Sequence, residues 1–141
     1  MPIDFLTMNK KAIAEFRANG GKCGPPFENT PIVLVTMKGA KSGRELCSPL
    51  AYSKDGNDVI VIASMGGAPN NPQWYHNLKA NPDVTIEVGA DKYEATALIT
   101  EGEERERLYA AQAKDLPIFN KYAEKAAPRV IPVFRFVRKA A

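Results

Sequence analysis

The sequence has few of the residues that would support a disulfide framework or a metal centre. Its 141 residues contain two cysteines, Cys23 and Cys47, and one histidine, His76. Two cysteines outside a C-x-x-C pair are too few to staple a small secreted fold, which favours a reducing, cytoplasmic setting. Because no Cys, Asp or Glu cluster surrounds His76 in the sequence, we expect no metal site.

Long apolar runs and a strong charge of one sign are also missing. No run approaches the ~20 apolar residues of a membrane-spanning helix, and we expect no signal peptide. The formal net charge of +3 is too mild for a nucleic-acid interface but suits an anionic small ligand. With 45% hydrophobic and 25% charged residues, the composition predicts one soluble domain over residues 1–141.

A turn rich in glycine and basic residues, at 39–44, is the first candidate ligand site. It lies between two extended runs. Glycines at positive φ expose backbone N–H groups that can form an anion-binding concavity. Lys41 and Arg44 add positive charge, and Ser42 adds a hydroxyl donor. The strand-to-strand context excludes a P-loop, so the turn either grips a phosphate or carboxylate or is a solvated hairpin turn.

The periodicity of apolar residues predicts a mainly β, α+β domain with flanking helices. Residues 1–26 form an N-terminal helix and loop, in which an amphipathic pattern over 4–18 predicts a helix packed on the core. Contact of that helix with a membrane surface is the alternative. Residues 30–138 contain about six antiparallel strands, an order that favours a small split or closed β-barrel. The expected strands are 31–38, 46–53, 58–64, 84–88, 92–100 and 130–137, and the later helices 72–80, 101–113 and 117–126.

Prolines give three more local predictions. Asn71 followed by Pro72 predicts a helix that starts with an Asn71 N-cap and Pro72 at its first position. Trp74 and Asn77, three residues apart, then share one face of that helix. Pro132, within the last apolar run, predicts an edge strand or a bulge there.

Three motifs resemble those of the deazaflavin-dependent nitroreductase family, whose members are also described as deazaflavin-dependent quinone reductases of mycobacteria and other actinobacteria. The resemblance covers about residues 31–137. It implies the split β-barrel of FMN-binding flavoproteins and the 8-hydroxy-5-deazaflavin coenzyme F-420, which carries a phosphate and a polyglutamate tail. The motifs read Gly39-x-Lys41-Ser42-Gly43, Ser48-Pro49-Leu50 and Gly66-Gly67-Ala68-Pro69-x-Asn71-Pro72-x-Trp74-Tyr75-x-Asn77-Leu78-Lys79-Ala80-Asn81-Pro82.

The resemblance also implies where the coenzyme binds. Its phosphate and tail are expected at Lys41, Ser42 and Gly43. Arg44 is a candidate to replace an arginine that some relatives have where this chain has Leu46. The residues expected to surround the deazaflavin ring are Ser48, Pro49, Leu50, Ala63, Ser64, Met65, Gly66, Trp74, Tyr75, Asn77 and Leu78.

The implied reaction is hydride transfer from reduced F-420 to a quinone, an activated enone or a nitroaromatic. Tyr122 is the candidate proton donor or orienting group, with Ser64 and solvent as alternatives. Nitroimidazole-reducing relatives surround the acceptor with tyrosines, whereas this chain offers Ala51, Phe119 and Tyr122. These differences from the relatives therefore count against nitroimidazole reduction more than against coenzyme binding.

Two other functions stay open for the same barrel. One is an FMN-dependent reductase or oxidase, with FMN as the less expected cofactor, and the other is a cofactor- or lipid-binding protein without turnover. The expected partner is a small-molecule acceptor, and barrels of this kind occur as monomers and as homodimers.

Overall fold

The structure, a computed structural model, describes residues 5–23, 31–64, 67 and 70–139, with side chains from residue 10 onward. Two of the expected ring contacts, Met65 and Gly66, lie outside the described residues. Ala68 and Pro69 of the longest motif do so as well.

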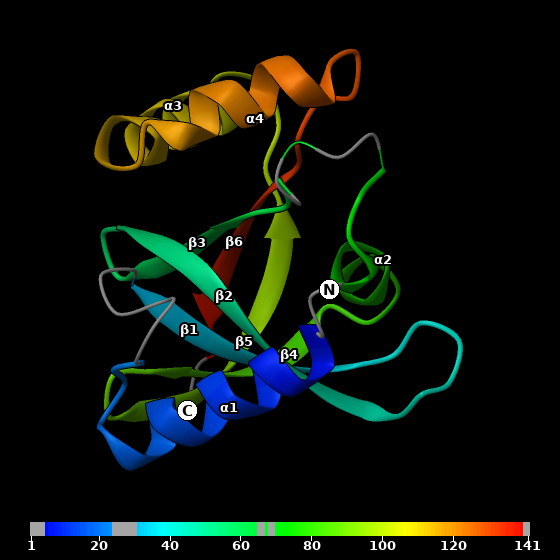
Figure 1. Cartoon of the computed structure of the whole chain (residues 1–141). Coiled ribbons are helices and arrows are strands. Elements are labelled where there is room, and N and C mark those ends of the chain that lie inside the picture. Colours follow the sequence, from blue (N-terminus) through cyan, green and yellow to red (C-terminus); the bar gives the residue numbers. More distant parts are fainter. Residues whose placement is uncertain (1–4, 24–30, 65–66, 68–69, 140–141) are drawn as a thin grey trace.

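Six antiparallel strands form a closed barrel in the middle of the molecule, in the order β1-β2-β3-β6-β5-β4 (Figure 1). This confirms the predicted fold class, a small barrel of about six antiparallel strands. The strands are β1 (Ile32–Lys38), β2 (Glu45–Asp55), β3 (Asp58–Ile62), β4 (Asp83–Val88), β5 (Asp91–Ile99) and β6 (Val133–Arg138). The helices are α1 (Phe5–Ala18), α2 (Gln73–Ala80), α3 (Gly102–Asp115) and α4 (Ile118–Ala126).

Alternation along the strands divides the apolar side chains between the barrel interior and the helices outside it. On β1, Val33 and Val35 pack inside the barrel with Phe134 and Phe136 of β6. Leu34, between them in sequence, belongs to the cluster beneath α1. β1 is therefore buried on both faces, by the barrel interior on one side and by α1 on the other.

The first helix packs on the barrel, as its amphipathic pattern predicts (Figure 1). Ala12 and Phe16 of α1 are buried against Leu34. Arg17 donates to both carboxylate oxygens of Glu87 on β4, at 3.2 and 2.9 Å. These apolar side chains are committed to the core, so the alternative of membrane contact gains no support from them and stays a prediction.

The prediction that Pro132 marks an edge strand or a bulge is wrong. β6 begins at Val133 and pairs with β3 on one side and β5 on the other. Pro132 lies just before the strand, where its missing N–H costs no ladder hydrogen bond. Its carbonyl accepts a hydrogen bond from the Ala63 N–H at 2.9 Å, and this contact bears on the candidate site below.

A cluster of charged side chains fastens α3 to the barrel. Arg135 of β6 donates to Asp55 at 2.6 Å, to Asp58 at 2.8 Å and to Glu104 of α3 at 3.1 Å. Arg107 of α3 donates to both oxygens of Asp55 at 3.0 Å. The hydrogen bonds from Arg107 and Arg135 hold the pKa of the Asp55 carboxyl well below its usual range.

This cluster predicts a pH-dependent contribution to stability. Because the pKa of Asp55 is lower in the folded state than its unfolded value of about 3.9, its ion pairs stabilise the fold above that pH. The contribution is lost as the pH falls through the unfolded value toward the folded one. Asp55→Asn should therefore lower the free energy of unfolding at pH 7, and its difference from wild type should shrink by pH 3.

Urea unfolding at the two pH values measures this effect. Asp91→Asn, at an exposed strand end, is the matched control and should change little at either pH. An Asp55→Asn deficit of equal size at both pH values would contradict the assignment.

One buried side chain of α3 predicts a stabilising substitution. Gln112 is only 1% exposed, and among the described residues neither its Nε2 nor its Oε1 has a hydrogen-bond partner. Leaving a buried polar group unpaired costs about 1–3 kcal/mol. Gln112→Leu, of similar volume, should raise the free energy of unfolding by about 1 kcal/mol in urea titrations.

The reverse substitution provides the control for that measurement. Gln112→Glu should destabilise the protein strongly, because it places an unpaired carboxylate at the same buried position. Gln112 also lines a cavity of about 450 Å³ between β2 and α3. A loss of stability in Gln112→Leu would show that water in this cavity satisfies the amide.

Candidate functional site

The glycine-rich turn joins β1 to β2, as predicted, but its two glycines serve different purposes. Gly43 has a positive φ of 68°. Gly39 does not, so the prediction of positive φ is wrong for this residue. A Cβ at Gly39 would instead lie 2.5 Å from Ser42 Oγ, so glycine at position 39 provides room for the hydroxyl.

Most backbone amides of the turn already have partners inside the protein. The Gly39 N–H donates to the Arg44 carbonyl at 2.8 Å, and the Gly43 N–H donates to the Gly39 carbonyl at 3.0 Å. The Arg44 N–H donates to Ser42 Oγ at 3.1 Å. Among the described residues, only the amides of Lys41 and Ser42 lack such a partner, which narrows the predicted anion-binding concavity to these two residues and the exposed basic side chains.

Asn77 connects this turn to α2. Its side chain is 3% exposed, and its Oδ1 accepts the Ala40 N–H at 2.9 Å and Gln73 Nε2 at 3.3 Å. Its Nδ2 lies 3.8 Å from Met37 Sδ. The amide of Asn77 is therefore engaged in holding the turn against the helix.

A cavity of about 460 Å³ lies between α1, the start of β2, and α2. Its volume lies within the range of small-molecule sites. It brings together three of the predicted coenzyme contacts, Ser48, Trp74 and Asn77. The full lining is Lys10, Ile13, Glu45, Leu46, Cys47, Ser48, Gln73, Trp74 and Asn77.

The sequence interpretation missed six residues of this lining, among them Glu45 at the start of β2. Lys10 and Ile13 come from α1, which the motifs do not include, so only the amphipathic pattern of that helix pointed toward them. Leu46 and Cys47 lie directly before the Ser48 motif, and burial raises the pKa of the Cys47 thiol. Gln73, the sixth, is the first residue of α2.

The aromatic residues of α2 pack against the barrel core. The Trp74 and Tyr75 rings lie 5.7 and 5.8 Å from the Phe134 ring inside the barrel. Leu78 of the same helix is buried in that core cluster. Trp74 thus contacts the core and also lines the cavity, whereas Leu78 belongs to the core, and the coenzyme contacts predicted for both residues stay predictions.

The segment after β3 packs against α4. A Cβ at Gly67, whose φ is 83°, would lie 2.9 Å from Lys125 Cβ and 3.0–3.1 Å from the Tyr122 backbone. No side chain fits this contact without displacing α4. Gly67 therefore lies close to the backbone of Tyr122, the candidate proton donor.

The remaining candidates differ in accessibility. Ala63 and Ser64 are buried, and Ala51 and Tyr122 are half-buried. Phe119 is 7% exposed and packs in the helix cluster with its ring 5.2 Å from Tyr122. This leaves Phe119 little surface to offer an acceptor.

Asn71 is not the N-cap of α2, so that prediction is wrong. The helix starts at Gln73 with Pro72 at the N-cap, and no side chain caps it. The Asn71 Oδ1 instead accepts a hydrogen bond from Arg129 Nη1 at 2.6 Å. Asn71 therefore connects the segment before α2 to the chain after α4.

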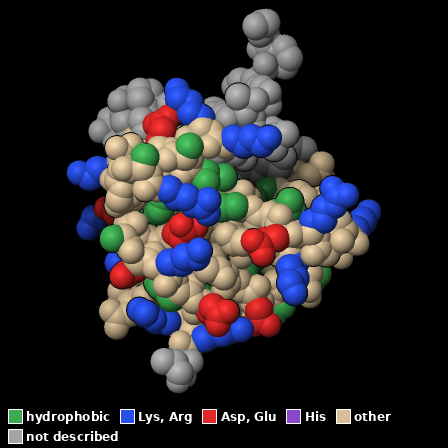
Figure 2. Space-filling model, turned by 90° about the horizontal axis from the view of Figure 1, so that it is seen from below, with side chains coloured by type: hydrophobic (Ala, Val, Ile, Leu, Met, Phe, Trp, Pro, Cys, Tyr) green, Lys and Arg blue, Asp and Glu red, His purple; other side chains and the backbone are tan. Residues whose placement is uncertain are grey.

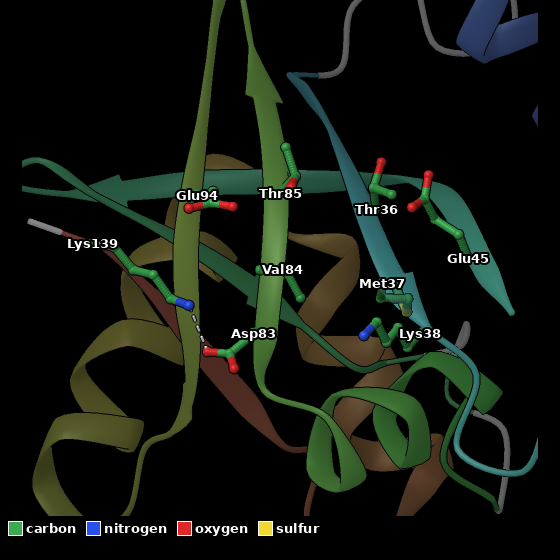
Figure 3. Close-up of a pocket in the computed structure, with 9 residues that line it drawn as sticks. All are labelled: Thr36, Met37, Lys38, Glu45, Asp83, Val84, Thr85, Glu94 and Lys139. Atoms are coloured by element: carbon green, nitrogen blue, oxygen red, sulfur yellow. Dashed lines mark ion pairs between the residues drawn. The ribbon is translucent and has the colours of Figure 1, made fainter. Parts of the chain in front are cut away.

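A second cavity, of about 230 Å³, lies where β1, β4 and β5 run side by side (Figure 3). Its lining includes three carboxylates, of Glu45, Asp83 and Glu94, and two lysines. Lys139 Nζ is paired with Asp83 Oδ1 at 2.8 Å. The excess of negative charge disfavours an anionic coenzyme here, so the cavity beside α2 is the better candidate site.

Charges of both signs are interleaved over the face of the molecule seen from below (Figure 2). That face gives no support to a nucleic-acid interface, which needs a concentrated basic patch. Among the described residues, no helix has the length and apolar character needed to cross a membrane. The His, Cys, Asp and Glu side chains within the described ranges form no group of three that could hold a metal ion.

A family model described as F420H(2)-dependent quinone reductase matches residues 8–137. The chain belongs to this family. An F420H(2)-dependent quinone reductase is an oxidoreductase, and F-420 is its cofactor. The family confirms the resemblance that the three motifs carry and the predicted reaction class.

Individual relatives agree with this membership. F420H(2)-dependent quinone reductase Rv1261c of Mycobacterium tuberculosis is 41% identical over 85 residues, which are 60% of this chain and 57% of that protein. The solved F420-H2 dependent reductase FDR-A is 40% identical with a TM-score of 0.69, covering 75% of this chain and 93% of its own. A solved domain-swapped dimer is 36% identical with a TM-score of 0.72, covering 96% and 99%.

The described residues fit the coenzyme of this family. The cavity beside α2 is large enough for part of a ring system and has an indole wall in Trp74. The turn with Lys41 and Arg44 adjoins it through the Asn77–Ala40 hydrogen bond. An aromatic-walled cavity and a basic turn, the surfaces that a ring and a phosphate would need, therefore lie next to each other.

Proposed function

We propose that this protein transfers hydride from reduced F-420, bound between β2 and α2, to a small quinone. Activated enones and nitroaromatics are the alternative acceptors. The observation that carries the proposal is the 460 Å³ cavity, because its Asn77 also holds the basic turn 39–44 in place. A ring site that adjoins an anion site suits a coenzyme with a ring at one end and a phosphate at the other.

In this proposal the turn binds the anionic part of the coenzyme. Lys41 supplies charge and a free amide, Ser42 supplies a second amide, and Gly43 permits the turn. Arg44, which is exposed at the end of the turn, adds charge. Lys10 of α1, at the edge of the cavity, contributes a further cation that the motifs do not include.

The ring lies against β2 and α2 in the same proposal. Ser48, Pro49 and Leu50 form one side, and Trp74 and Tyr75 form the other. Asn77 and Leu78 support these walls from the turn and the core. The segment after β3 contributes Ala63 and Ser64, together with Met65 and Gly66 outside the described residues.

F-420, when bound, supplies a two-electron hydride donor. The chain positions the acceptor, excludes water and provides the proton that follows the hydride. The Tyr122 hydroxyl is the proposed donor, since Gly67 holds its helix against the ring-contacting segment. Ser64 and solvent are the alternatives, Ala51 flanks the acceptor, and Phe119 supports the Tyr122 ring from the core.

Titration of the purified protein with oxidised F-420 and with FMN, followed by fluorescence, tests the cofactor site. Saturable F-420 binding without tight FMN binding supports the proposal. Tight binding of FMN alone would assign the barrel to FMN chemistry instead. Steady-state oxidation of reduced F-420 with menadione, cyclohexenone or a nitroaromatic then ranks the acceptors, and binding without turnover would identify a cofactor carrier.

The oligomeric state, monomer or homodimer, stays a prediction. The structural neighbour that forms a domain-swapped dimer supports the homodimer. Size-exclusion chromatography with light scattering measures the mass directly and separates the two states.

A further inference from the structure

The guanidinium of Arg129 contacts both ends of the segment that runs from β3 to α2. Its Nη1 donates to the Ala63 carbonyl at 3.1 Å and to Asn71 Oδ1 at 2.6 Å. Its Nη2 donates to the Ser64 carbonyl at 2.9 Å. One planar side chain thus joins residues at the two ends of a loop. The rigid guanidinium can donate to several acceptors in fixed directions, which a lysine ammonium cannot do in the same way.

The same loop is held against α4 at its middle. The Gly67 N–H donates to the Ser64 carbonyl at 2.9 Å, so this carbonyl accepts from both Gly67 and Arg129. Gly67 in turn lies so close to α4 that a Cβ added to it would come within 3.0–3.1 Å of the Tyr122 backbone. Arg129 itself follows α4 directly, and its N–H donates to the Ala126 carbonyl at 2.9 Å.

We propose that Arg129 is a positioning residue that fixes the ring-contacting segment at Ala63 and Ser64 relative to Tyr122 on α4. This inference rests on the proposed function, because only the proposed function assigns Ser64 and Tyr122 to the coenzyme and acceptor. Arg129 acts through the backbone of the loop and contacts neither substrate nor ring in this role.

The partial burial of the Arg129 guanidinium supports its role in holding the loop in place. Burial lowers the pKa of Arg129, so the partly buried guanidinium loses some of its solvation. The bonds to two backbone carbonyls and one amide oxygen offset that loss. Three hydrogen bonds from one rigid guanidinium hold Ala63, Ser64 and Asn71 at defined distances from the chain after α4. Hydride transfer is sensitive to displacements of about 1 Å.

Arg129→Lys and Arg129→Met test the assignment in the full-length protein. Both should lower kcat with menadione by about 10²-fold, as expected for a displaced reacting group. The dissociation constant of F-420 should change little, because the turn 39–44 binds the anionic end. In Arg129→Ala, added guanidinium ion should restore part of kcat, whereas ammonium ion should not.

Arg105 provides a matched control. Its Nε and Nη2 donate to the Ile131 carbonyl at 3.2 and 2.7 Å, so it too joins a helix to the chain before β6. Among the described residues, its hydrogen bonds go to Ile131 and Glu106 and not to the loop between β3 and α2. Arg105→Lys and Arg105→Met should therefore lower stability to a similar extent while kcat stays close to wild type.

A readout independent of activity separates this proposal from the proposed function. Hydrogen exchange in the protein without coenzyme should speed up at the Ala63 and Gly67 amides in Arg129→Lys, and not in Arg105→Lys. Wild-type kcat in Arg129→Lys, or equal exchange in both variants, would overturn the role of Arg129. If wild type binds F-420 but never turns over, the proposed function fails and the exchange result still decides the role of Arg129.

Discussion

Gly67→Ala should be the most damaging single-methyl substitution on the ring-contacting segment. The added Cβ would meet Lys125 Cβ and the Tyr122 backbone at 2.9–3.1 Å. A φ of 83° adds the cost of a left-handed conformation, about 1–2 kcal/mol for a residue with a side chain. With overpacking costs of about 1–3 kcal/mol, the free energy of unfolding should fall by about 2–5 kcal/mol in urea titrations.

The same substitution should reduce turnover in the fraction that folds. Backbone at Tyr122 cannot rotate away as a flexible side chain could, so either the loop or α4 must shift. Under the proposed function, that shift separates Ser64 from Tyr122 and lowers kcat by 10-fold or more, on the order expected for a misplaced group. Stopped-flow oxidation of reduced F-420 by menadione measures this rate.

Gly56→Ala is the matched control for Gly67→Ala. Gly56 has a similar φ of 65°, in the turn between β2 and β3, and a Cβ there would meet nothing within 4 Å. It should therefore cost only the conformational term, about 1–2 kcal/mol, and leave turnover unchanged. Equal effects of the two substitutions would show that the packing of Gly67 on α4 contributes nothing.

Lys41→Ala should weaken F-420 binding by roughly 1.5–3 kcal/mol, the size of one charge-assisted contact. This is about a 10- to 100-fold increase in the dissociation constant. Lys41 is exposed, and its amide has no partner within the described residues, so both groups are available to an anion. Because the exposed Lys41 side chain is not packed against the core, Lys41→Ala should leave the melting temperature unchanged.

Lys38→Ala removes the same charge three residues earlier, where the side chain lines the acidic cavity beside β4 instead. It therefore controls for the general loss of positive potential at this end of the barrel. Lys38→Ala should change F-420 affinity by less than about 1 kcal/mol, the usual value for an exposed charge. Unchanged affinity in Lys41→Ala would remove Lys41 from the site.

The sequence by itself determined the order and type of the secondary-structure elements and the family. The β-branched apolar run of β1 and the amphipathic pattern of α1 are local properties of the sequence. The three motifs identified the family because they resemble those of its members, and the family implies F-420. The turn 39–44 was recognisable from its glycines and basic residues between two extended runs.

Only the tertiary structure decided how the site is held together. Asn71 has a side chain of the type that caps helices. Its Oδ1 nevertheless accepts a hydrogen bond from the Arg129 guanidinium, 58 residues away in sequence. Pro132 marks no edge, because β3 and β5 close the barrel on both sides of β6. The amides of turn 39–44 are mostly engaged within the turn and by Asn77.

These differences have one physical reason. Short-range preferences fix φ, ψ and periodicity, whereas the partner of a polar side chain depends on which distant groups the fold brings within about 3 Å. The roles of Arg129, Asn77 and Lys10 therefore follow from the closed barrel and its helices. The residue types of the turn 39–44 and of the motif at 66–82 could be interpreted in advance because neighbours in sequence define them.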